Sequence, residues 1–345
     1  MSTIKRILVP TDFSEDSGYA LETASEIAKR YDAEVDLLYV VPSIQHFMRY
    51  LSSELKTEYS ETLNQEAEKK LRELSQKIRP ENRGDRIVLF DNNAGKAVLE
   101  QIRAGDYDLV MIGSKGSDRT KLGRGSTAQH IIRGSRVPVL SVNRFLNNES
   151  VNRIMISTDG SDLSFAALSP AVIMADIWDA DIVLFYVHEL RGGLIENLYT
   201  SPEEIQKERI YDRLLKKLDS FMDKNKTGGL RLERGEKPYH DRILFSRDNQ
   251  DIATNLITDV KTGFSSHHEI RQYAEKNADL VVMGTHGYSG FAHVMLGSVT
   301  EKVIQNLDKP VLTVRPYESD FILSERGVGE VKNQETSPIP PWHWL

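Results

Sequence analysis

The feature that most constrains the fold of this chain is an internal repeat with an offset of 147 residues. Residues 5–14 (KRILVPTDFS) form a short apolar run that ends in an aspartate and a serine, and residues 153–161 (RIMISTDGS) repeat this pattern. Each run is followed by an amphipathic helical pattern and then by a second apolar run, at 35–41 and 182–187. A chain of 345 residues with this repeat indicates two domains of similar build.

The second half of each copy repeats as well. Residues 108–116 (DLVMIGSKG) match residues 279–287 (DLVVMGTHG), and each copy ends on a Pro-Val-Leu run, at 138–140 and 310–312. Continuous Val, Ile and Leu runs that alternate with amphipathic helices are typical of parallel strands covered by helices on both faces. We therefore predict an α/β, Rossmann-like protein with two doubly wound parallel sheets of about five strands each.

Changes in periodicity mark the domain boundaries. Periodicity is lost around residues 143–151, so we expect a first domain at 1–145 and a second at 151–316. The offset between the copies grows from 147 to 171 at the glycines, and we place the additional residues in a hairpin near 229–250, with a plain surface loop as the alternative. Residues 317–345 form a polar, proline-rich tail. Charged helices are expected near 51–79 and 203–225.

Composition excludes several classes of protein. The absence of cysteine excludes disulfides, thiolate nucleophiles and cysteine-ligated metals. Lysine and arginine number 44 against 51 aspartates and glutamates, and neither half is the basic domain that a nucleic-acid binder usually has. No stretch approaches the roughly 18 uncharged apolar residues of a membrane span, and no signal-peptide core is present. We expect a cytoplasmic protein that binds neither nucleic acid nor membrane.

Glycines after the fourth strand of the second copy form the most informative motif. Gly284-x2-Gly287-x9-Gly297-Ser298 leads into a helical pattern, with Ser298 as the expected N-cap and Glu301 three residues later. Glycines let the backbone approach an anion, and the free N–H groups of a first helical turn suit phosphate. The motif therefore predicts a phosphate cradle. Turn punctuation is the alternative interpretation.

An aspartate ends the first strand of each copy at the same sheet edge, where open α/β sheets bind their ligands. Asp12 and Asp159 could each accept a hydrogen bond from the base or ribose of a ligand, or could simply cap the following helix. Because the aspartate and the glycines recur together in both copies, we favour a ligand site.

In these features the chain resembles a tandem member of the universal stress protein family, over residues 4–314. The glycine motif marks the members of that family that bind ATP. The resemblance implies an adenine-nucleotide α-hydrolase-like fold whose two copies pack through their last strands as an intramolecular pseudo-dimer. It also implies a nucleotide site in the second copy, formed by Asp159, Val187, Gly284, His286, Gly287, Gly297, Ser298 and Val299.

The first copy departs from the family motif, because only eight residues separate Gly116 from Gly125. The resemblance implies a weaker second site there, formed by Asp12, Val40, Gly113, Gly116, Gly125 and Ser126. The same loop carries Lys115, Arg119, Lys121 and Arg124, which either supplement the phosphate contacts or form a solvated basic loop. We expect the second copy to bind ATP and the first to bind it poorly.

The implied function is that of an ATP-binding protein with a regulatory or stress-response role and little or no turnover. No dinucleotide-binding or P-loop glycine motif is present. We assign no catalytic residue, since Ser298 lacks partners for nucleophilic catalysis, and no metal site, since His267-His268 lacks ligands at i+4.

Two alternatives remain open, a nucleotide-independent interaction scaffold and a slow ATP-hydrolysing enzyme of the adenine-nucleotide α-hydrolase-like group. The sequence also leaves open whether Mg²⁺ accompanies ATP, which protein partner is recognised, and whether the chain forms a homodimer.

Overall fold

The computed structural model describes residues 4–42, 53–116, 124–190, 203–225, 229–247, 250–285 and 296–315. The strands of the first copy are β1 (Arg6–Pro10), β2 (Glu34–Val41), β3 (Arg83–Phe90), β4 (Leu109–Gly113) and β5 (Val139–Val142). Those of the second copy are β6 (Arg153–Thr158), β7 (Asp181–Glu189), β8 (Arg231–Glu233), β9 (His240–Arg247), β10 (Gln250–Gly263), β11 (Leu280–Gly284) and β12 (Val311–Val314).

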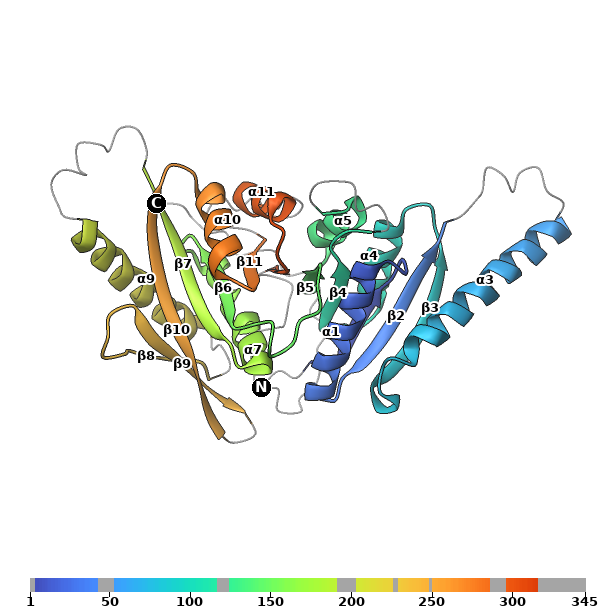
Figure 1. Cartoon of the computed structure of the whole chain (residues 1–345), viewed down its shortest axis with the longest axis horizontal. Helices are drawn as coiled ribbons and strands as arrows, with labels where there is room; N and C mark the ends of the chain where they lie inside the picture. Colours follow the sequence, from blue (N-terminus) through green and yellow to red (C-terminus); the bar gives the residue numbers. More distant parts are fainter. Residues whose placement is uncertain are drawn as a thin grey trace.

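These strands form one twelve-stranded sheet in the order β3-β2-β1-β4-β5-β12-β11-β6-β7-β10-β9-β8. Figure 1 shows the sheet running across the molecule, with the second copy on the left and the first on the right. The α/β class and the parallel pairing within each copy agree with the sequence prediction. The prediction of two separate sheets is wrong, because β5 and β12 pair antiparallel and join the copies, with Leu312 opposite Leu140.

The sheet of the first copy ends at its edge strand β3, whereas that of the second copy continues beyond β10 with β9 and β8. β8 pairs antiparallel with β9, and β9 pairs antiparallel with β10. β10 meets β9 from Gln250 onward and runs parallel with β7 only from Leu256 onward. The residues near 229–250 thus form strands that extend the sheet.

Helices cover both faces of the sheet. One face carries α1 (Glu15–Tyr31), α3 (Ser53–Ser75), α6 (Asp162–Phe165), α7 (Leu168–Trp178) and α9 (Glu203–Asn225). The other carries α4 (Ala94–Ala104), α5 (Ser126–Gly134), α10 (Ser266–Asn277) and α11 (Ser298–Asn306). A 3-10 turn, η1 (Pro80–Asn82), precedes β3.

Successive side chains of a strand point to opposite faces of the sheet, and this alternation explains why the core has two apolar layers. In β1, Ile7 and Val9 are buried against the α1 layer, whereas Leu8 is buried against the α4 and α5 layer. Both apolar clusters run through both copies, so the core is continuous across the β5–β12 junction.

Backbone details repeat between the copies. Asp32 and Asp179 end α1 and α7 with φ of 53°, the left-handed conformation that closes a helix. Asp108 accepts hydrogen bonds from the backbone N–H groups that start β1, and Asp279 does so at the start of β6. Among the described helices, none is both long enough and apolar enough to cross a bilayer.

Candidate functional site

A cavity of about 480 Å³ opens at the carboxyl ends of β6, β7 and β11 in the second copy. The structure brings six of the predicted residues together around it: Asp159, Val187, Gly284, Gly297, Ser298 and Val299. His286 and Gly287 lie outside the described residues. Apolar contacts to a ligand are available from Ile270 and Met283, which also line the cavity.

A short turn after β6 fixes the position of Asp159. The Oδ1 atom of Asp159 accepts hydrogen bonds from the backbone N–H and the hydroxyl group of Ser161. The hydroxyl oxygen of Thr158 accepts from the N–H of Gly160 at 2.9 Å and lies 2.7 Å from the hydroxyl oxygen of Ser164. The carboxylate is therefore held at the cavity by its own loop.

The first copy contains the same turn. Asp12 accepts from the N–H of Ser14 at 3.1 Å, and Thr11 accepts from the N–H of Phe13 at 3.0 Å. The hydroxyl oxygens of Thr11 and Ser17 lie 3.0 Å apart. Sequence reasoning missed the Thr and Ser pairs, although their recurrence 147 residues apart is a signal that could have identified them.

The start of α11 differs from the predicted cap. Gly297 is the N-cap, Ser298 is the first helical residue, and no described side chain caps the helix. Glu301 does not reach back to the helix start; its carboxylate pairs with Arg133 of the first copy. The hydroxyl group of Thr300 donates to the carbonyl oxygen of Gly284 at 3.0 Å, which ties α11 to the end of β11. The expected capping box is therefore wrong.

A second cavity, of about 530 Å³, occupies the equivalent place in the first copy. All six residues predicted for the weaker site line it: Asp12, Val40, Gly113, Gly116, Gly125 and Ser126. A Cβ on Gly116 would lie 2.8 Å from a carboxylate oxygen of Asp12, so a side chain there would displace that carboxylate. Gly125 caps α5, which no described side chain caps either.

Asp16 shapes the first cavity and was missed by sequence reasoning. This buried residue accepts hydrogen bonds from the hydroxyl group of Ser114 and from the N–H of Lys115, both at 3.0 Å. A Cβ on Gly113 would lie 2.7 Å from the backbone nitrogen of Ser17. The first glycine loop is thus held tightly against the start of α1. The second copy has Leu163 at the position of Asp16, so this anchor is specific to the first copy.

Two basic residues of this loop contact the second copy. Arg124 is buried, and its guanidinium group donates to the carbonyl oxygens of Ile304, Leu307 and Lys309 and to the hydroxyl oxygen of Ser141. Burial lowers the pKa of Arg124 to about 10.

For Arg124, neither of the two alternatives, a supplementary phosphate contact or a solvated basic side chain, agrees with this burial and these partners. Lys115 lies 3.5 Å from the carboxylate of Asp308, also in the second copy. Arg119 and Lys121 lie outside the described residues. Within the described ranges, no group of three or more metal-ligating side chains is positioned to hold an ion.

Comparison with known proteins agrees with this architecture. The family model described as the universal stress protein family matches residues 3–143 and 150–315. A universal stress protein of Mycolicibacterium smegmatis is 24% identical over 326 residues, covering 90% of this chain and 97% of that protein. One from Methanocaldococcus jannaschii is 33% identical over 174 residues, covering 49% of this chain and 85% of that protein.

A solved structure shares the fold over nearly the whole chain. It is a universal stress protein from Archaeoglobus fulgidus, with a TM-score of 0.58 and 21% identity, covering 90% of this chain and 98% of that one. The family model matches twice and accounts for most of the sequence. The chain therefore belongs to the universal stress protein family, as a tandem member with two copies of the family's domain.

Proposed function

We propose that this protein binds ATP, chiefly in the second copy, and serves a regulatory or stress-response role with little or no turnover. The observation that carries the proposal is the start of α11, where a glycine N-cap without a capping side chain among the described residues opens onto the cavity that also contains Asp159. The free N–H groups of such a first turn, together with the positive end of the helix dipole, favour a phosphate group.

The conformation of the glycine supports this proposal. Gly297 has φ of −55°, and Gly125, its counterpart in the first copy, has φ of −61°, values that any residue adopts. A Cβ on Gly125 would meet its nearest atom, the backbone nitrogen of Gly116, at 3.6 Å, an ordinary contact. Neither φ angle requires glycine, and around Gly125 the structure leaves room that a ligand could use.

The rest of the cavity suits the other end of a nucleotide. The N–H of Gly297 donates to the carbonyl oxygen of Thr285 at 2.7 Å, so the phosphate donors in the proposed complex are the backbone N–H groups of Ser298 and Val299, beside Gly297. In that complex the backbone of Val187 meets adenine, and Asp159 accepts a hydrogen bond from the base or ribose. The apolar side chains of Ile270 and Met283 would shield the base from water.

We propose a weaker site in the first copy. Its glycine loop is one residue shorter, is anchored by Asp16, and directs Arg124 and Lys115 to the second copy. Because hydrogen-bond lengths vary by only a few tenths of an ångström, a displaced loop would misplace its donors.

The antiparallel β5–β12 pair and the ion pair of Arg133 with Glu301 support an intramolecular pseudo-dimer.

The proposal is tested by identifying the small molecule released when freshly purified protein is denatured. We expect adenine nucleotide at about one molecule per chain, and a higher thermal midpoint when ATP is added, because a ligand that binds only the folded state stabilises it. Absence of nucleotide together with an unchanged midpoint would instead favour a nucleotide-independent scaffold. Product analysis after incubation with ATP, with and without Mg²⁺, tests for turnover.

A further inference from the structure

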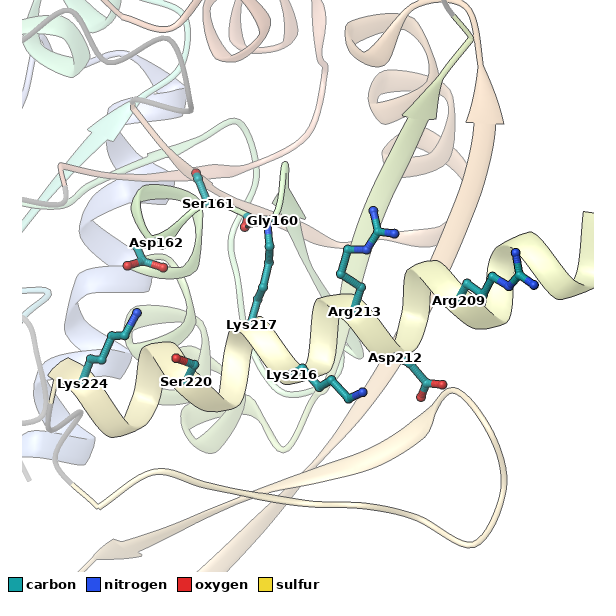
Figure 2. Close-up of a pocket in the computed structure, with 10 residues that line it drawn as sticks. All are labelled: Gly160, Ser161, Asp162, Arg209, Asp212, Arg213, Lys216, Lys217, Ser220 and Lys224. Atoms are coloured by element: carbon teal, nitrogen blue, oxygen red, sulfur yellow. Dashed lines mark hydrogen bonds between the residues drawn. The ribbon is translucent and has the colours of Figure 1, made fainter. Parts of the chain in front are cut away.

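A basic groove lies beside the proposed nucleotide site of the second copy, between α9 and the loop that follows Asp159 (Figure 2). Its volume is about 830 Å³. Gly160, Ser161 and Asp162 form the loop side, and α9 supplies five basic side chains: Arg209, Arg213, Lys216, Lys217 and Lys224. We use the name basic groove for this cavity.

Positive charge dominates the basic groove. The carboxylate of Asp212, which also lines it, lies 3.2 Å from the guanidinium group of Arg234. In the described part of the chain, no carboxylate forms an ion pair with Arg209, Arg213, Lys216 or Lys224, and all four are exposed. The loop contributes one more carboxylate, that of Asp162. The groove therefore presents a net positive charge to an anion.

The cations are arranged along one side of the helix. Positions 209, 213, 217 and 224 follow the spacing that places residues on one helix face. Figure 2 shows Arg213, Lys217 and Lys224 extending from α9 toward the loop, and the ammonium group of Lys217 donates to the carbonyl oxygen of Gly160 at 3.1 Å. From residue 209 to residue 224 the helix rises about 22 Å. This is an elongated basic strip.

The first copy shows that the fold does not require the groove. At the 147-residue offset, Phe13 replaces Gly160 and Lys70 replaces Lys217. The ring of Phe13 packs on Tyr39 with centroids 4.6 Å apart, and the ammonium group of Lys70 lies 5.4 Å from the Phe13 ring centre. The cavity beside Phe13 has a volume of only about 250 Å³. Part of the space beside Gly160 is taken by Leu214, which stands where the first copy has Ala67 and would lie 3.3 Å from a Cβ on Gly160. The cavity is thus smaller in the copy where Phe13 and Ala67 replace Gly160 and Leu214.

The charged residues of α3 and α9 also differ, and α9 is the more positive of the two along the groove. Three of the five cations recur in the first copy, as Lys69 and Lys70 on α3 and Lys77 just after it. The two arginines do not, because Thr62 and Glu66 stand where α9 has Arg209 and Arg213. Glu73 also stands where α9 has Ser220. Phe13 has φ of 62° and Gly160 has φ of 77°, so the turn itself accepts a side chain. Neither the larger cavity nor the two arginines are needed for folding, and they occur together in the second copy alone.

We propose that the basic groove binds a linear polyphosphate anion, the class that includes pyrophosphate, tripolyphosphate and longer chains. Arginine forks and serine hydroxyls donate well to phosphate oxygens, and successive lysines match a row of negative charges. The volume lies within the range of small-ligand sites. The residues that line the groove are charged, serine or glycine, so it lacks the apolar anchor that a protein partner would use.

The test is calorimetric titration of tripolyphosphate into the full chain and four variants. Arg213→Glu introduces the first-copy residue and should lower affinity about tenfold or more, because charged hydrogen bonds contribute strongly. Arg72→Glu, an exposed change on α3 with the same change in net charge, is the matched control and should leave affinity unchanged. Gly297→Val, which targets the proposed nucleotide site, should also leave it unchanged.

Gly160→Phe, made together with Leu214→Ala, is an independent steric test, because the two changes introduce the first-copy residues Phe13 and Ala67, and Tyr186 already stands where the first copy has Tyr39. We expect loss of tripolyphosphate binding with ATP binding retained, and weaker wild-type binding as salt rises. Retention of binding in either Arg213→Glu or the double variant Gly160→Phe with Leu214→Ala would overturn the proposal. So would loss in Gly297→Val, which would assign the phosphate to the nucleotide site, or binding of hexaglutamate without tripolyphosphate.

Discussion

The guanidinium group of Arg124 donates a hydrogen bond to the backbone carbonyl oxygen of Lys309 at 2.6 Å, joining the two copies. It also donates to carbonyl oxygens at the end of α11, those of Ile304 and Leu307, where a cation favours the helix dipole. Leu296 precedes the second helix-capping glycine as Arg124 precedes the first, so the second copy has no equivalent cation at that position.

Arg124→Leu, which introduces the residue found in the second copy, should destabilise the protein. We expect a loss of about 2–4 kcal/mol in the free energy of unfolding, because several buried carbonyl groups would lose their donor. Denaturant unfolding followed by circular dichroism measures this change. Arg133→Leu is the control at the same junction, and since its ion pair is partly exposed it should cost less than about 1 kcal/mol. Equal effects would contradict the structural role of Arg124.

Asp159→Ala should lower the affinity for adenosine and for ATP by a similar factor, about tenfold, because the carboxylate is proposed to bind the base or ribose and not the phosphates. Equilibrium titration of both ligands measures the two factors. Asp12→Ala is the control in the first copy and should change ATP binding little. If ATP binding falls while adenosine binding is unchanged, Asp159 acts at the phosphates and the proposed orientation is reversed.

Tyr273 predicts a specific alkaline loss of stability. Its ring stacks on Phe185 with centroids 4.1 Å apart, and burial, followed by the charge of Asp259, raises its pKa above the ordinary value of 10. Above about pH 10 the unfolded chain loses the tyrosine proton more readily than the folded chain, so stability falls as pH rises. Below about pH 10 the stability that the protonated Tyr273 side chain contributes is fully present.

Tyr273→Phe removes the titrating group, so its unfolding free energy should fall less steeply than that of the wild type between pH 9 and about 11. Tyr59→Phe, at an exposed position, should follow the wild type. Parallel pH profiles for Tyr273→Phe and the wild type would show that Tyr273 ionises equally in both states.

Much of the fold could be predicted because each pattern found in one copy could be checked against the other copy. Apolar runs at matching offsets predicted parallel strands, and the structure has them in both copies. The short apolar runs of β5 and β12 do not by themselves show that their edges pair, so the expectation that the copies pack through their last strands came from the family resemblance alone, and the structure has this pair. The helix cap was misplaced by one residue, from Gly297 to Ser298, because a cap depends on backbone angles that neighbouring polar residues can equally suggest.

The sequence could not predict where long side chains point either. Arg124 lies in a basic loop, yet its carbonyl acceptors are about 180 positions away and become neighbours only through the β5–β12 pair. The exchange of Phe13 for Gly160 is visible in the sequence, but only the structure shows the groove beside α9.

Calorimetric titration of ATP into Gly297→Val and Gly125→Val shows which of the two copies binds the nucleotide. Both glycines cap equivalent helices with ordinary φ angles, so both variants should keep the fold, which thermal unfolding checks. We predict that Gly297→Val abolishes most ATP binding, because the branched side chain occupies the space where phosphate approaches the helix start, and that Gly125→Val retains it. Loss of binding in Gly125→Val with full retention in Gly297→Val would contradict the account.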